Sequence, residues 1–304
     1  MDSRLFLKCT LGVSRAPFLT LSLVTLVFSW SLAFFQSGFP SFIDSLLILI
    51  AMMSAHIGVN ALNEYQDFVS GLDLTTDKTL FSGGSGTLVD HPEFADTARL
   101  IAYLFIGLAL CIGLWFIFSV GIELLPVGIL GLWIVMNYTI TINRHPWLCL
   151  VAPGLGIGVL ATLGSVYILS GSLSVMSVLL VIGFSLLLNN LLLLNQFPDA
   201  QADAQVNRQH LWITHSSDFV LAVFRLQWIA ALILVLLCAE YVGVFLFSLI
   251  VLGVLLFVYP LWKYTKSKDE LQDNLISALG KNVMLCHAYP AFLSVVLIIS
   301  RWLT

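Results

Sequence analysis

Long apolar runs separated by short polar segments dominate the pattern of hydrophobic and polar positions along this chain. A helix needs about 20 consecutive apolar residues to cross the hydrocarbon core of a bilayer, and nine runs meet that requirement. The runs are too long and too uniformly apolar for the alternating strands of a membrane β-barrel. We therefore predict an all-α polytopic membrane protein with nine transmembrane helices. The predicted spans are residues 17–35, 41–64, 97–119, 122–140, 148–170, 174–197, 218–240, 242–263 and 281–303.

The composition supports the same class of protein. Hydrophobic residues make up 59% of the 304 residues and charged residues 10%, whereas soluble domains contain roughly 25% charged residues. We expect a single transmembrane domain over residues 1–304, embedded in a lipid bilayer and without a nucleic-acid partner.

The basic residues predict the orientation of the chain. Arg4, Lys8 and Arg15 precede the first span, and all but one of the 13 Lys and Arg residues fall on the same side of the predicted topology. The exception is Arg301. Because basic residues concentrate in cytoplasmic loops, we expect a cytoplasmic N-terminus and a C-terminus on the opposite side, as in a protein of a bacterial inner membrane.

Two similar polar stretches lie at the cytoplasmic ends of the second and sixth predicted spans. The stretch "NEYQD" at 63–67 is matched by "NQFPD" at 195–199, and the second copy continues to Asp203. Residues three and four apart share one face of a helix, so each stretch presents its acids together. The sequence therefore predicts two acidic clusters that face one central cavity, opening to the cytoplasmic side.

The helix at the second stretch is expected to end early. Pro198 has no backbone N–H and distorts a helix, which fits a place where the sixth span gives way to a loop.

Carboxylates at the ends of two spans predict a cation site. Mg²⁺ binds through one or two carboxylates while it keeps water and substrate phosphate in its shell, so the paired clusters indicate diphosphate binding. The same carboxylates also fit solvated loop residues. Lys78 and Arg208 follow the two stretches and can contact phosphate oxygens, but both also fit the ordinary excess of basic residues in cytoplasmic loops. The loop "SGGSG" at 82–86 is not followed by GK[ST], which makes it a weak phosphate motif.

The main alternative is an ion-coupled membrane transporter that uses the paired acidic clusters as an ion site. Transporter sites lie near the middle of the membrane, whereas these acids lie at the ends of the predicted spans. Their position therefore favours diphosphate binding over transport.

Three segments carry a resemblance to a known family. The segments 60–88 ("NALNEYQDFVSGLDLTTDKTLFSGGSGTL"), 193–211 ("LLNQFPDAQADAQVNRQHL") and 137–158 ("NYTITINRHPWLCLVAPGLGIG") resemble the UbiA superfamily of intramembrane prenyltransferases. They are most similar to the 1,4-dihydroxy-2-naphthoate prenyltransferase branch of menaquinone biosynthesis. The first motif of that superfamily usually reads Asn-Asp, and this chain has Asn63-Glu64 instead.

The resemblance implies an enzyme that binds an isoprenyl diphosphate through Mg²⁺, ionises the allylic C–O bond and lets an aromatic or other lipophilic acceptor attack the carbocation. Tyr138 is a candidate to stack on or hydrogen-bond this acceptor, and Arg144 is a candidate to meet an acidic one. The catalytic acids implied by the resemblance are Asp67, Asp199 and Asp203. The implied metal ligands are Glu64, Asp67, Asp73, Asp199 and Asp203. The substrate-binding candidates are Asn63, Asn195, Lys78, Arg208, Arg144 and Tyr138.

Overall fold

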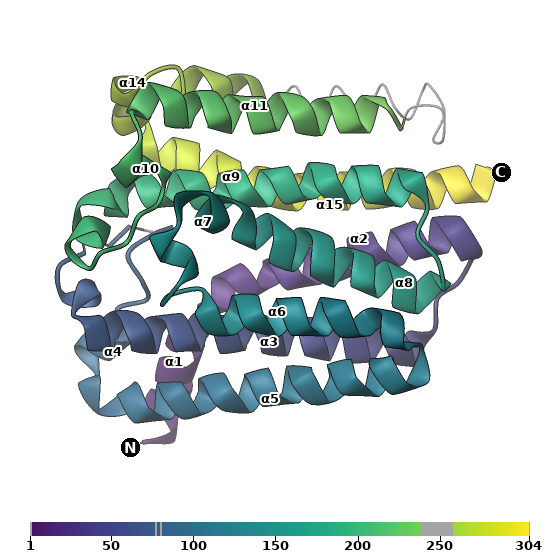
Figure 1. Ribbon diagram of the computed structural model, residues 1–304, viewed down its shortest axis with the longest axis horizontal. Helices are drawn as coiled ribbons and strands as arrows, with labels where there is room; N and C mark the ends of the chain where they lie inside the picture. Colours follow the sequence, from purple (N-terminus) through teal and green to yellow (C-terminus); the bar gives the residue numbers. More distant parts are fainter. Residues whose placement is uncertain (1, 77, 80, 239–257, 304) are drawn as a thin grey trace. The chain divides into compact units, whose positions relative to one another are not determined.

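The structure is a computed structural model that describes residues 2–76, 78, 79, 81–238 and 258–303 (Figure 1). Within these residues all regular structure is helical. The chain divides into two compact units. The first unit contains residues 1–23, 46–149 and 196–213, and the second contains residues 24–45, 150–195 and 214–304.

The principal helices differ widely in length, from single turns to 31 residues. They are α1 (Ser3–Val13), α2 (Thr20–Ser37), α3 (Phe42–Ser70), α4 (Thr87–Asp90), α5 (Ala95–Ser119), α6 (Leu125–Asn137), α7 (Pro146–Pro153), α8 (Gly164–Ser170), α9 (Val175–Gln205), α10 (Leu211–Thr214), α11 (Ser217–Leu236), α14 (Lys268–Asp273) and α15 (Leu275–Leu303). Short 3-10 turns occupy Ala16–Leu19, Leu72–Leu74, Pro92–Phe94, Ile122–Leu124 and Ile142–Arg144, and a π-helical segment covers Gly154–Leu163.

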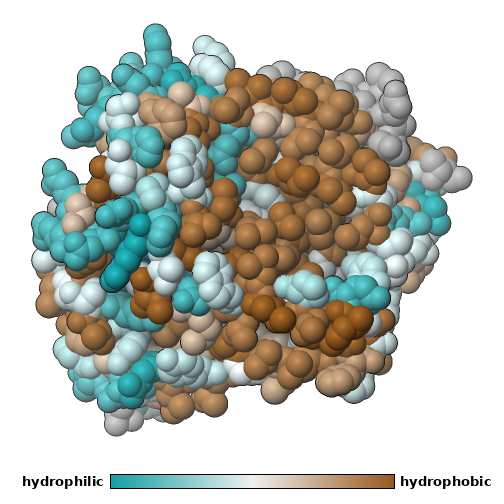
Figure 2. Space-filling view, in the orientation of Figure 1, coloured by the Kyte–Doolittle hydropathy of each residue, from teal (hydrophilic) through white to brown (hydrophobic). Residues whose placement is uncertain are grey.

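Seven helical segments are long and apolar enough to cross a membrane, which confirms seven of the predicted spans by length and composition. The fourth predicted span, 122–140, contains an apolar helix that is shorter, Ile122–Asn137. Most of the eighth, 242–263, lies outside the described residues. The seven segments are Ala16–Ser37, Phe42–Ser70, Pro92–Ser119, Pro146–Ser170, Val175–Gln205, Ser217–Leu236 and Leu275–Leu303. Figure 2 shows apolar residues over much of the visible surface, as expected for helices that face lipid.

The helices that carry the two polar stretches are longer than their apolar runs. α3 continues past the predicted end at residue 64 to Ser70, and α9 continues past residue 197 to Gln205. The prediction that the helix gives way to a loop at Pro198 is therefore wrong. Proline removes only one backbone donor, and Asp199 and Asp203 beyond it are bonded to Gly83 and Arg208, so the last turns of α9 remain helical.

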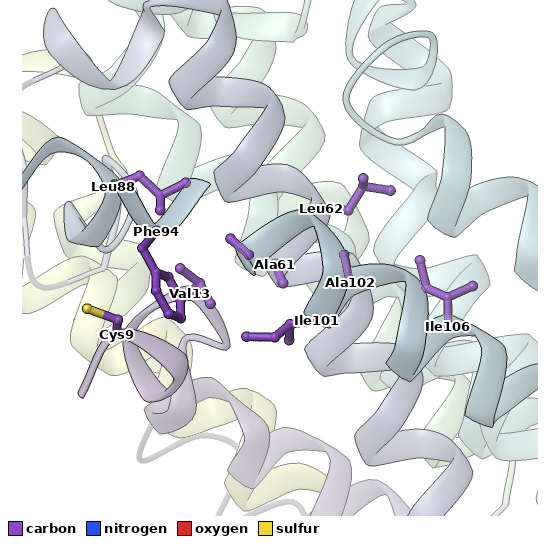
Figure 3. Close-up of a cluster of buried hydrophobic side chains, with 10 residues drawn as sticks. Cys9, Val13, Ala61, Leu62, Leu88, Phe94, Ile101, Ala102 and Ile106 are labelled. Carbon is purple, nitrogen blue, oxygen red and sulfur yellow. The ribbon is translucent and has the colours of Figure 1, made fainter. Parts of the chain in front are cut away.

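A buried core in the first unit fixes the start of the chain against α3 and α5 (Figure 3). Val13 of α1, Leu88 of α4 and Ala102 of α5 are all fully buried in it. Gly58 lets α3 approach α5 closely, because a Cβ there would lie 3.2 Å from the backbone nitrogen of Ile106. The core therefore places the C-terminal end of α1 beside the polar half of α3.

In the second unit, α9 makes polar contacts with other helical segments. Asn189 Oδ1 accepts the N–H of Gly154 at 2.9 Å, and Asn190 donates to the carbonyl of Phe224 in α11 at 2.9 Å. Asn282 of α15 donates to the carbonyl of Asn190 at 2.9 Å. Asn189 and Asn190 thus make helix–helix contacts, as polar residues in apolar spans commonly do.

Candidate active site

The first motif lies in the last three turns of α3. Asn63 donates through Nδ2 to Asp67 Oδ2 at 2.9 Å and accepts from Thr139 Oγ1 at 2.9 Å, so its amide holds one carboxylate oxygen of Asp67 in place. The other oxygen, Oδ1, accepts from Arg208. Because both of its carboxylate oxygens accept hydrogen bonds, Asp67 is tolerated in a nearly buried position.

Asp73 reaches the same region after α3 has ended. Gly71 adopts a left-handed conformation (φ 80°) and ends the helix, as glycine commonly does one residue past a C-terminus. The following turn Leu72–Leu74 buries Asp73. Burial, together with the charges of Asp67 and Glu64, raises the pKa of Asp73 to about 7. Among the described residues, its buried Oδ2 has no hydrogen-bond partner.

The second motif occupies the end of α9. Asp199 accepts the backbone N–H of Gly83 through Oδ2 at 3.2 Å, and its buried Oδ1 has no hydrogen-bond partner in the described part of the chain. Asp203, one turn further on, accepts from Arg208 through Oδ1 at 2.9 Å. Its Oδ2 lies 3.1 Å from Nε2 of His210.

Arg208 joins the two motifs. Its guanidinium donates from Nη2 to Asp67 of α3 and from Nη1 to Asp203 of α9. Asn207 makes this possible, because its left-handed conformation (φ 61°) turns the chain back after α9, and asparagine tolerates that region better than most residues. The expected meeting of the two acidic stretches is thus present within the first unit, around one planar cation.

Glu64 is held by a different cation. Its Oε1 accepts from Arg15 Nε at 2.6 Å and from the backbone N–H of Ser85 at 2.9 Å, while Oε2 accepts from Ser85 Oγ at 2.6 Å. The carboxylate is fully buried. Glu64 therefore binds the glycine-rich loop 82–86 to the end of α1.

Gly84 faces the acids at close range, which leads to a testable prediction. Its φ is 72°, and a Cβ would lie 3.1 Å from Asp73 Oδ1. Gly84→Ala is expected to cost about 1–2 kcal/mol for the left-handed backbone and also to displace the Asp73 carboxylate. The melting temperature in detergent should fall, and the KM for the prenyl diphosphate that the resemblance implies should rise.

The matched control for this change is Gly38→Ala. Gly38 has a similar φ of 87° but nothing within 4 Å of its Cβ position. It should lose comparable stability with an unchanged KM. Equal KM values for the two variants would show that Gly84 has no part in the site.

The ion pairs that join the two motifs do not include the other predicted residues. Lys78 is exposed, and its side chain lies against Gly86. Tyr138 follows α6 and is partly buried, whereas Arg144 is exposed at the end of the turn Ile142–Arg144. Asn195 belongs to the second unit, and its buried Oδ1 has no hydrogen-bond partner among the described residues.

Sequence reasoning missed Arg15, Ser85 and His210 as parts of the site. Arg15 is separated from Glu64 by 49 positions, and it fits the general excess of basic residues before the first span. His210 does carry a signal in retrospect, since it lies two residues after Arg208 in a loop that returns to the acids.

The donor atoms of the site fit a hard divalent cation. No three His, Cys, Asp or Glu side chains in the described residues are grouped closely enough to form a ready-made metal cage. Mg²⁺ does not require one, because it commonly uses one or two carboxylates and completes its shell with water and phosphate. The buried oxygens of Asp73 and Asp199 that have no hydrogen-bond partner in the described residues are suited to be such ligands.

Known proteins resemble this chain in sequence and in fold. A 1,4-dihydroxy-2-naphthoate octaprenyltransferase of Bacillus subtilis (strain 168) is 28% identical over 207 residues, which are 66% of this chain and 64% of that protein. This chain therefore matches somewhat less than two thirds of the length of that relative.

The fold is that of solved UbiA homologs. One from Archaeoglobus fulgidus bound to GPP and Mg²⁺ has a TM-score of 0.68 at 15% identity, covering 93% of this chain and 98% of that chain. The apo structure of a UbiA homolog from Aeropyrum pernix K1 has a TM-score of 0.63 at 16% identity, covering 91% and 97%. The model of the UbiA prenyltransferase family matches residues 22–279. On this match, the chain belongs to the UbiA prenyltransferase family.

Proposed function

We propose that this protein transfers an isoprenyl chain from a prenyl diphosphate to an aromatic quinone precursor, with 1,4-dihydroxy-2-naphthoate as the acceptor. The observation that carries the proposal is the convergence of acids from α3 and α9 on Arg208. The family membership supports the reaction, and the similarity to a Bacillus subtilis 1,4-dihydroxy-2-naphthoate octaprenyltransferase supports the acceptor.

In this mechanism, four aspartates form the metal site. Asp73 and Asp199, with Asp67 and Asp203 beside them, would hold Mg²⁺. When bound, Mg²⁺ supplies Lewis-acid stabilisation of the charge that develops on the diphosphate. Asn63 keeps Asp67 oriented through its amide, so this carboxylate does not need to reorganise during the reaction.

The basic residues act on the leaving group. As the allylic C–O bond breaks, its electron pair moves to the diphosphate oxygen, and Arg208 and Lys78 donate hydrogen bonds to the oxygens that gain charge. The acceptor ring then attacks the allylic carbon to form the new C–C bond and regains aromaticity by losing a proton, or its carboxylate as CO₂, from the attacked carbon. Tyr138 and Arg144 are the proposed contacts of this ring. The apolar surfaces of the helices accommodate the isoprenyl chain and exclude water from the cation.

The proposed site faces the cytoplasm. This orientation is supported by the basic residues, nearly all of which fall on the side of the N-terminus in the predicted topology.

The decisive experiment measures products in isolated membranes. Membranes that contain the protein, supplied with 1,4-dihydroxy-2-naphthoate and a series of prenyl diphosphates, should form prenylated naphthoquinone precursors detectable by mass spectrometry. Product formation should stop in EDTA, because hard oxygen ligands hold the Mg²⁺ that the reaction needs. It should return when Mg²⁺ is added in excess, because the protein remains folded without the ion. Ion flux through proteoliposomes, without product from any prenyl diphosphate, would replace this proposal with a transporter.

A further inference from the structure

Glu64 differs from Asp73 and Asp199 in having both of its oxygens bonded. A carboxylate offers about four lone-pair positions, and three of those on Glu64 accept bonds from Arg15 and Ser85. Asp73 and Asp199, in contrast, each keep one buried oxygen without a partner in the described residues. The acid that replaces the usual aspartate of the first motif is therefore the one least open to a metal.

The loop that Glu64 holds also contacts both acids with open oxygens. In this loop, Ser82–Gly86, the N–H of Gly83 donates to Asp199 at 3.2 Å. The Cβ position of Gly84 lies 3.1 Å from Asp73 Oδ1 and 3.5 Å from Glu64 Oε1. The position of this loop thus determines the surroundings of Asp73 and Asp199 together.

Arg15 forms the fixed end of this arrangement. Its backbone is left-handed (φ 48°), a conformation that a residue other than glycine adopts at a cost unless its surroundings hold it. Val13, two residues earlier, is fully buried in the core of the first unit, and the ion pair with Glu64 lies beyond it. The packing of α1 and the ion pair together hold Arg15 in place.

We propose that Glu64 is a positioning residue: with Arg15 and Ser85 it holds the loop Ser82–Gly86 over Asp73 and Asp199, and it does not itself coordinate Mg²⁺. The inference rests on the proposed function, since it concerns the same site. It removes Glu64 from the proposed metal ligands, which leaves the aspartates. It also gives the glycine-rich loop a structural role in place of a phosphate-binding one.

Trypsin provides a test that needs neither metal nor substrate. Lys78 is the only Lys or Arg between Arg15 and Arg99, and it lies exposed just before the loop. Trypsin digestion in EDTA, with mass spectrometry of the fragments, measures the rate of cleavage after Lys78. This rate reports how often the loop opens. Glu64→Gln and Arg15→Gln should each accelerate this cleavage by roughly tenfold or more, because each removes a charged hydrogen bond.

The control variants are Glu93→Gln and Asp96→Asn. Both carboxylates are exposed, Glu93 pairing with His91 and Asp96 with Arg99, so neither change should alter cleavage at Lys78. If Glu64→Gln fails to accumulate in membranes, Ser85→Ala tests the same contact from the loop side and should give a smaller acceleration, since its backbone N–H still donates to Glu64.

Magnesium titrations distinguish positioning from ligation. In the positioning role, Glu64→Gln and Arg15→Gln should raise the KM for the prenyl diphosphate to similar extents, with little change in the Mg²⁺ concentration for half-maximal activity. A rise in that concentration for Glu64→Gln alone, with wild-type cleavage at Lys78, would overturn the inference. Absence of prenyl transfer in the wild type would refute the proposed function but would leave the cleavage result to decide the role of Glu64.

Discussion

Asp199→Asn is expected to abolish nearly all prenyl transfer while the protein stays folded. Asp199 accepts the N–H of Gly83 and lies within hydrogen-bonding reach of the Ser82 side chain, and an asparagine oxygen can accept from the same donors. The unpaired Oδ1 loses its charge, and with it a ligand for the cation that stabilises the leaving diphosphate. By comparison with the removal of one preorganised electrostatic contact in other enzymes, kcat should fall by about 10²- to 10³-fold. Steady-state kinetics in detergent or nanodiscs measures this change.

The control for Asp199→Asn is the same chemical change on the surface. The side chain of Asp96 is 86% exposed and pairs with Arg99, so Asp96→Asn should retain full activity. The melting temperature of Asp199→Asn should lie close to that of the wild type. Wild-type kcat at saturating Mg²⁺ in this variant would remove Asp199 from the catalytic site.

The two motifs of the candidate site can be predicted from the sequence. The repeated Asn-x3-Asp spacing indicates two acidic helix ends, and the structure brings Asp67 and Asp203 to one guanidinium. It does not indicate which cation each acid binds, because the partner of Glu64 lies 49 positions away, before the first span. Pairing across such a distance depends on how α1 packs, and local spacing carries no information about that packing.

The fold is predictable where hydrophobicity alone determines it. Apolar runs give the seven long spans with ends that differ from the observed ones by at most eight residues, because the bilayer requires about 20 apolar residues of any helix that crosses it. The polar last turns of α3 and α9 were missed, since ion pairs and hydrogen bonds stabilise them. α1 was missed for another reason: Leu5, Cys9 and Val13 mark its inner face, but it has only 11 residues.

Arg208→Gln is expected to have the second large effect, and this effect is on stability as well as on activity. Arg208 is 15% exposed, and it is bonded to two carboxylates that are themselves nearly buried. Removing one partner from a buried ion pair commonly costs about 3–5 kcal/mol, because the remaining charge is left uncompensated. The melting temperature in EDTA should therefore fall well below that of the wild type, and kcat should fall because the leaving diphosphate loses a donor.

Magnesium should stabilise this variant more than it stabilises the wild type. Once Arg208 is removed, Asp67 and Asp203 repel each other, and a divalent cation bound beside them restores the missing positive charge. Melting curves with and without Mg²⁺ measure this difference, with Arg4→Gln as the control because this arginine is exposed on α1. An equal Mg²⁺-induced shift in Arg208→Gln and the wild type would show that the cation does not bind close to these two acids. Arg208→Lys should fall between the two proteins, since one ammonium group keeps the charge but cannot bond both carboxylates as a planar fork does.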